Sequence, residues 1–145
     1  DLRLVPRTDG GAWLVWTSGP VADESPWINL VPITADGQLA GSITTFPAAY
    51  HDGTLAATSF DNLLMVAWIQ DSGPDGATPH VQVFDPNGKP TGSIDVKADG
   101  LTSGRLTLLA APQGRSAVLG FTETVPDPSL GDQIRLTRID CVEPL

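Results

Sequence analysis

Cysteine, histidine and basic residues are scarce in this chain. Of 145 residues, one is cysteine, two are histidine and eight are lysine or arginine. The single Cys141 excludes a disulfide within the chain. We expect it to be a half-buried thiol in a last strand, or else a half-cystine whose partner lies outside this sequence. His51 and His80 lie in no nucleophile or metal-binding motif, and with one cysteine they are too few for a zinc site. No catalytic residue is therefore predicted.

The shortage of positive charge and of long apolar runs limits the partners. Seventeen acidic residues against eight basic ones give a net charge of −9, which repels nucleic acid and anionic lipid headgroups. The longest nearly apolar run, residues 63–69, is too short to span a bilayer. We therefore predict neither nucleic-acid binding nor direct membrane insertion. The chain begins at Asp1 without Met and enters a strand-like pattern at once, so we expect a processed chain or a piece of a longer one.

Glycine and proline are abundant, and they indicate the fold class. Hydrophobic residues make up 41% of the chain and charged residues 17%, with 15 glycines and 13 prolines. This composition is typical of many short strands joined by tight turns, whereas long helices tolerate neither glycine nor proline well. The composition therefore predicts an all-β protein.

Three segments of the chain follow the same plan. Each has an apolar run that leads into an aromatic residue, and these residues, Trp16, Trp68 and Phe121, lie 52 and 53 positions apart. The phrases "VPITADGQLAGSI" (31–43) and "VFDPNGKPTGSI" (83–94) also share a turn glycine and a Gly-Ser-Ile. Alternating apolar and polar residues predict strands, and a period of about 52 residues indicates a repeated supersecondary unit.

Each unit reads as a meander of short antiparallel strands. The units cover approximately residues 1–47, 54–97 and 104–145 of a single domain. The first two offer four strands each, with turn sequences rich in glycine, aspartate and asparagine. In the third unit no further Gly-Ser-Ile strand follows "IRLTRID" at 134–140, so this unit is predicted to be incomplete. A β-sandwich, which also uses many short strands, is the alternative fold.

With these repeats, the chain resembles the blade repeats of secreted or surface bacterial β-propellers. The resemblance lies in the four-stranded units of about 52 residues and their recurring aromatic and turn positions. It implies a partial β-propeller of about three four-stranded antiparallel blades, and an extracytoplasmic location. Propellers usually close with four to eight blades. We therefore expect the ring to be completed by further sequence, by a second copy of the chain, or by another protein.

Acidic residues gather in the loops that the propeller interpretation places on one face. These loops would carry nine of the 17 acidic residues. Carboxylates with nearby aromatic rings suit a basic protein or a glycan, and oxygen-rich loops suit Ca²⁺, although turn preference alone explains much of this pattern. The predicted ligand-binding residues are Trp27, Tyr50, His51, Asp71, Asp75, Asp127 and Asp132, and the predicted Ca²⁺ ligands are Asp71, Asp75, Asp127 and Asp132.

Two classes of function remain open from the sequence. The first is a non-enzymatic scaffold or binding module that presents an acidic loop face to a protein or glycan. The second is a propeller-type glycan hydrolase or lyase that uses the four loop carboxylates just named, because paired carboxylates can cleave glycosidic bonds. No feature of the sequence singles out one carboxylate pair.

Overall fold

The chain folds into β-strands joined by turns. The computed structural model describes residues 1–19, 27–48, 54–71, 77–97, 101–102, 105–111, 116–124, 129 and 131–140. These ranges hold twelve strands and no helix, which confirms the all-β prediction. Accordingly, no helix in the described part of the chain is long and apolar enough to cross a membrane.

Sheet 1 is an antiparallel meander in which each strand pairs with the next along the chain. Its order is β1-β2-β3-β4. The turn between β1 and β2 uses Gly10 at a φ of 86°, a left-handed conformation that glycine adopts without strain. The four strands are Leu2–Pro6, Ala12–Ser18, Trp27–Ile33 and Thr44–Pro47.

Sheet 2 repeats this arrangement with the order β5-β6-β7-β8. Asp61 and Asn62 form the two-residue turn between β5 and β6, both at positive φ, as a tight hairpin that matches the strand twist requires. Gly88 takes a φ of 81° in the turn between β7 and β8. The four strands are Ala56–Phe60, Leu63–Asp71, Ala77–Phe84 and Pro90–Asp95.

Sheet 3 has the order β10-β11-β12, with the short β9 paired to the far end of β11. Residues 97–104 were expected to be a loop between units, and this is wrong for β9, which lies in that segment. β9 and β10 pair with different parts of the same edge of β11, so together they act as one interrupted first strand. The strands are Leu101–Thr102, Thr107–Ala110, Ser116–Thr124 and Asp132–Asp140.

The repeated Gly-Ser-Ile does not have the same structure in the first two sheets. In sheet 2 it lies inside β8 and pairs with β7. In sheet 1 it comes before β4, so the fourth strand there begins only after the repeated phrase. Leu30 pairs with Thr44 and Ile33 bridges to Leu39, so the returning segment has two more residues than β3 between these pairs. Extra residues of this kind interrupt a ladder.

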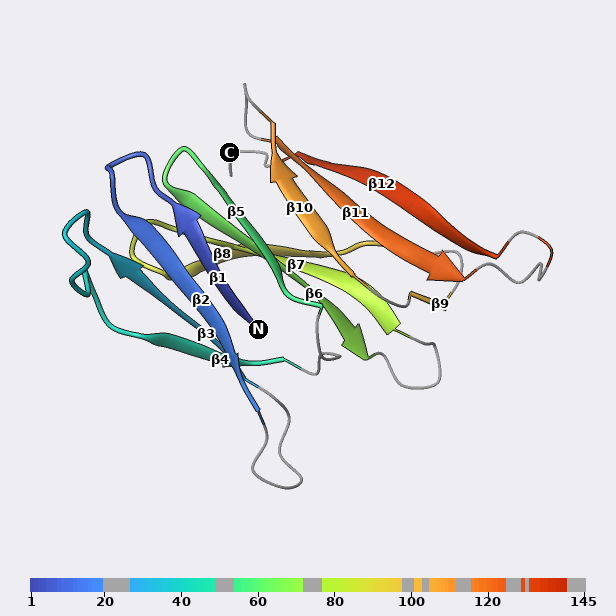
Figure 1. Cartoon of the computed structure of the whole chain (residues 1–145), viewed down its shortest axis with the longest axis horizontal. Coiled ribbons are helices and arrows are strands. Elements are labelled where there is room, and N and C mark those ends of the chain that lie inside the picture. The colour runs from blue at the N-terminus through green and yellow to red at the C-terminus, as the bar shows by residue number, and fades with distance from the viewer. Residues whose placement is uncertain are drawn as a thin grey trace.

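The three sheets follow one another in space, with sheet 2 in the middle (Figure 1). Their first strands, β1, β5 and β10, are neighbours. The Ala110 amide donates a hydrogen bond of 3.3 Å to the Thr58 hydroxyl, and the Ser59 hydroxyl donates to the Pro6 carbonyl. These bonds connect β10 to β5 and β5 to β1.

The turn between β7 and β8 also reaches sheet 1. The Thr44 hydroxyl donates to the Gly88 carbonyl at 3.1 Å, and the Arg7 guanidinium donates to the Pro86 carbonyl at 3.4 Å. These two bonds join segments that are far apart in sequence, so they help to fix sheet 2 against sheet 1.

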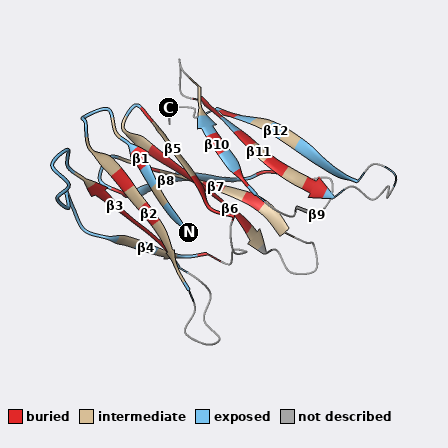
Figure 2. Cartoon of the chain, in the orientation of Figure 1, coloured by how far each residue is buried: buried red, intermediate tan, exposed pale blue. Residues whose placement is uncertain are grey.

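Two hydrophobic cores fill the spaces between the sheets, and sheet 2 contributes to both (Figure 2). Alternate residues of β6 point to opposite sides, since side chains alternate along a strand. The core between sheets 1 and 2 contains Val5, Trp13, Val15, Ile28, Leu30, Ala48, Leu55, Leu64, Val66, Trp68 and Phe84. The core between sheets 2 and 3 contains Ala56, Phe60, Met65, Ala67, Ile69, Val81, Val96, Leu106, Leu108, Ala117, Leu119, Phe121 and Ile139.

Each sheet therefore has two distinct faces. We call the face that points toward the next sheet along the chain the leading face, and the opposite face the trailing face. On the central strands β2, β6 and β11, the leading face holds Val15, Ala67 and Gly120, and the trailing face holds Trp16, Trp68 and Phe121.

Candidate functional site

The residues predicted to bind ligand are only partly within the described structure. Trp27 begins β3 and is partly exposed, as expected for a residue after a loop. Asp132 begins β12, where its carboxylate accepts a hydrogen bond of 2.7 Å from the Thr124 hydroxyl across the strand pair. Of Asp71, the last residue of β6, the backbone alone is described. The remaining predicted residues, together with the lone cysteine, lie outside the described residues: Tyr50, His51, Asp75, Asp127 and Cys141.

The predicted calcium site accordingly stays a prediction. Three of its four ligands are Asp71, Asp75 and Asp127, whose side chains lie outside the described part of the structure. Among the side chains that are described, no three histidine, cysteine, aspartate or glutamate groups lie close enough together to hold a metal ion.

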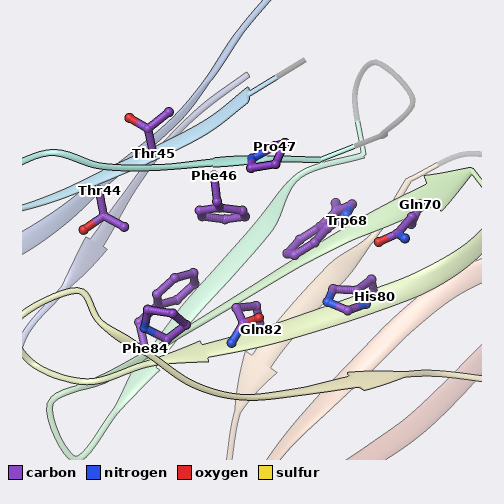
Figure 3. A pocket seen from close by; sticks show the side chains of 10 residues that line it. Thr44, Thr45, Phe46, Pro47, Trp68, Gln70, His80, Gln82 and Phe84 are labelled. Carbon is purple, nitrogen blue, oxygen red and sulfur yellow. The ribbon is translucent and has the colours of Figure 1, made fainter. Parts of the chain in front are cut away.

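A cleft of about 450 Å³ opens between sheets 1 and 2, a size that falls within the usual range for small-molecule sites (Figure 3). It lies between the leading face of sheet 1 at β4 and the trailing face of sheet 2. None of the described residues that line it is a lysine, an arginine or a carboxylate. The lining residues are Thr44, Thr45, Phe46, Pro47, Trp68, Gln70, His80, Gln82, Phe84 and Pro90.

The aromatic rings of this cleft are already engaged with one another. The Trp68 ring lies 5.6 Å from the ring of Phe46 and 4.4 Å from that of His80, measured between centroids. His80 Nδ1 lies 2.5 Å from a carboxylate oxygen of Asp95, which fixes the imidazole. Trp68 and Phe84 are almost completely buried. The rings of the cleft therefore pack against one another and help to join sheet 1 to sheet 2.

The leading face of sheet 3 is an exposed apolar surface. Antiparallel partners lie on the same face of a sheet. Leu109 pairs with Val118 across β10 and β11, and Gly120 pairs with Leu136 across β11 and β12. Leu136 is 71% exposed and Ile134, two residues earlier on the same face, is 79% exposed. A contiguous apolar surface of this kind usually marks an interaction site.

The trailing face of sheet 1 is the matching surface at the other end of the molecule. Leu4 pairs with Leu14, and Leu2 pairs with Trp16, across β1 and β2. Leu2 and Leu4 are exposed, while Leu14 and Trp16 are half-buried. Trp13 and Trp68 pack in the core between sheets 1 and 2, whereas Trp16 lies on this outer face.

A buried polar group holds the trailing face of sheet 1 together. The Asn29 side chain donates a hydrogen bond of 3.0 Å to the Ser18 hydroxyl and accepts one of 2.9 Å from the Thr45 hydroxyl. Asn29 is buried, so both of its polar ends are satisfied within the sheet. The described residues of this face include no formally charged side chain.

Charged groups lie at the margins of the sheets. Glu123 is buried at the end of β11 on the trailing face, and the Arg135 guanidinium lies 3.4 Å from its carboxylate. In the turn between β1 and β2, hydrogen bonds from the Arg7 guanidinium, helped by the Gly11 amide, hold the pKa of Asp9 below its usual value. These pairs stabilise turns and strand ends. On the leading face of sheet 3, Arg138 and Asp140 form a further ion pair of 2.8 Å near the end of β12, beside the apolar centre of that face.

We compared the chain with protein families and with curated proteins. No protein-family model matches the chain, and no curated protein is significantly similar to it. The functional argument therefore rests on the two outer faces, which we call the open faces: the trailing face of sheet 1 and the leading face of sheet 3.

Proposed function

We propose that this chain is a non-enzymatic scaffold or binding module: a three-blade segment of a β-propeller, completed by further sheets that pack on its open faces. We also propose an extracytoplasmic location, which the resemblance to secreted propeller repeats implies. A protein partner, and not a small molecule, is the ligand that the open faces favour.

One observation carries the proposal: the open faces occupy the same register positions as the faces that already pack inside the chain. On the leading side, Leu136 of sheet 3 corresponds to Val81 of sheet 2, which is buried against sheet 3. On the trailing side, Trp16 of sheet 1 corresponds to Trp68 of sheet 2, which is buried against sheet 1. Each open face thus repeats a surface that packs against another sheet within this chain.

Three features support a propeller over a β-sandwich. The three sheets are successive meanders, their first strands are neighbours, and sheet 2 is covered on both faces. A sandwich packs two sheets around a single core, whereas propeller blades pack in series around an axis. In such a ring every blade has another blade packed on each face. In the described structure, sheets 1 and 3 each have a neighbouring sheet on one face only.

The acidic loop face and the glycan hydrolase hypothesis depend on the carboxylates of the loops. Of the four proposed catalytic carboxylates, the described structure includes only that of Asp132, which is hydrogen-bonded to Thr124. The engaged aromatic rings of the cleft give little support to glycan binding there. The scaffold function is therefore the stronger proposal.

Apolar-dye fluorescence tests whether the open faces are contact surfaces. At a dilution where the chain is monomeric, we expect it to bind the dye, and Ile134→Thr to reduce this binding without lowering the melting temperature. Ile94→Thr is the matched control, because Ile94 is also exposed but lies on the leading face of sheet 2, away from both open faces. Equal dye binding by the wild type and both variants would count against the proposal.

A further inference from the structure

We infer that the partner on the open faces is a second copy of this chain, bound head to tail. The leading face of sheet 3 in one copy would pack on the trailing face of sheet 1 in the next. The inference rests on the proposed function, since it names the partner that the open faces take. Both halves of the contact belong to the same chain, so each copy supplies the surface that the other lacks.

Side-chain size at the centre of each sheet supports this pairing. At the central position, the leading face carries a small residue and the trailing face an aromatic one in all three sheets. The small leading residues are Val15, Ala67 and Gly120, and the aromatic trailing residues are Trp16, Trp68 and Phe121.

Small central leading residues and aromatic central trailing residues occur together in both described cores, beside larger leading residues such as Trp13 and Met65. Val15 and Trp68 belong to the core between sheets 1 and 2, and Ala67 and Phe121 to the core between sheets 2 and 3. A head-to-tail contact would place Gly120 of one copy and Trp16 of the other in the same relation. Pairing two leading faces, or two trailing faces, would instead oppose small with small or large with large, and would pack poorly.

Charge also indicates what kind of contact this is. Each copy carries a net charge of −9, so two copies repel one another at long range. The described trailing face of sheet 1 has no formal charge, and the charged groups of the leading face lie toward the two ends of β12: Asp132 at its start, and Arg138 and Asp140, which form an ion pair, at its end. The contact is therefore apolar, and added salt should strengthen it by screening the repulsion.

The number of sheets favours a closed pair over an open chain. The described residues of one copy form three sheets, so those of two copies form six, which falls within the four to eight blades of closed propellers. A closed pair would cover all four open faces with two equivalent contacts. Neither open face of the described sheets would then remain to bind a third copy.

Two variants test the head-to-tail contact. Leu2→Lys with Leu4→Lys blocks the trailing face of sheet 1, and Leu109→Lys with Leu136→Lys blocks the leading face of sheet 3. A buried, unpaired charge is costly, so the dissociation constant for self-association of each variant should be at least about 100-fold higher than that of the wild type. Light scattering coupled to size exclusion should show dimers for the wild type and for the control Ile94→Lys, and monomers for each blocked variant.

Mixing the two blocked variants gives the decisive result. Each retains one intact face, and the two intact faces are complementary, so an equal mixture should form a one-to-one dimer through that single contact, open on the side where the two blocked faces would otherwise meet. Self-association of either blocked variant alone would overturn the head-to-tail arrangement in favour of like faces. Circular dichroism confirms that each variant is folded.

The wild type separates failure of this inference from failure of the proposed function. A monomeric wild type whose dye binding is lost in the leading-face variant would overturn the second copy as partner but leave the open faces as docking surfaces. A monomeric wild type that binds no apolar dye would overturn both. Dimers that dissociate when salt is added would also contradict the apolar contact.

Discussion

Two adjacent leucines on β10 allow a sharp test of how the sheets face one another. Leu108 pairs with Leu119 and is 7% exposed, within the core between sheets 2 and 3. Leu109 pairs with Val118 and is 68% exposed on the open face of sheet 3. The substitutions Leu108→Ala and Leu109→Ala remove the same atoms from neighbouring positions, so they differ only in the side of the sheet that they affect.

The expected costs differ several-fold. Replacing a buried leucine by alanine removes its transfer free energy and leaves a cavity, at about 2–5 kcal/mol in well-packed cores. We expect about 3 kcal/mol for Leu108→Ala, a large part of the roughly 5–15 kcal/mol by which most domains are stable. Exposed substitutions usually change stability by less than about 0.5 kcal/mol, which is our expectation for Leu109→Ala in the monomer.

Urea denaturation followed by circular dichroism measures both values. Dilute protein should be used, because Leu109 would contribute to the contact between copies and its loss would then appear as lost stability. A strand register shifted by one residue exchanges the two faces of a sheet. If Leu109→Ala costs as much as Leu108→Ala, or more, the assigned register of β10 and the open face of sheet 3 are both wrong.

Three further substitutions test turns and buried polar groups. Gly37→Ala should cost about 1–2 kcal/mol, because alanine is strained in the left-handed backbone conformation and the added Cβ meets open space. Gly88→Ala should cost about 1 kcal/mol more, because the Cβ added at Gly88 would also meet Thr44 and Leu30 at 3.0–3.1 Å. Equal melting temperatures of the two variants would contradict this packing. Asn29→Ala removes two hydrogen bonds and should lower the free energy of unfolding by about 2 kcal/mol, measured in urea, and a neutral result would show that the bonds do not form. The folded-state pKa of Asp9 is lowered, so the ionised carboxylate stabilises the fold fully above the unfolded-state pKa, and this stabilisation is lost as the pH falls through the folded-state pKa. Titration of Asp9 by NMR should show a low midpoint in the wild type and a higher midpoint in Arg7→Gln. An unchanged midpoint in Arg7→Gln would refute the Arg7 contact.

The sequence predicts the strands well because their pattern is local. Alternating apolar residues and turn sequences such as "DN" at 61–62 depend on a few neighbouring positions, and the structure has hairpins where they indicate them. The repeat also aligns Trp16, Trp68 and Phe121, which all lie on trailing faces. The short β9 was missed since two residues carry no detectable alternation.

What the sequence could not predict is how the sheets cover one another. Trp16 and Trp68 look alike in their strands, yet only Trp68 has a sheet packed over it. The alternating pattern around Leu136 likewise predicts a core residue. Leu136 is exposed because sheet 3 lies at one end of the row of three sheets, with no sheet packed on its leading face. The candidate site consists of such residues. The alternation that predicts the strands is the same for core residues and for residues of the open faces, so it does not distinguish the site.

The small-to-aromatic relation between neighbouring sheets has a consequence for how such a chain can grow. Sheet 2 presents Ala67 on one side and Trp68 on the other, so it fits between two neighbours of its own kind. A duplicated gene segment encoding one unit could be inserted beside it without redesign of either adjoining surface. Relatives by descent would then differ in length by multiples of about 52 residues, and insertions of other lengths would fall in the loops.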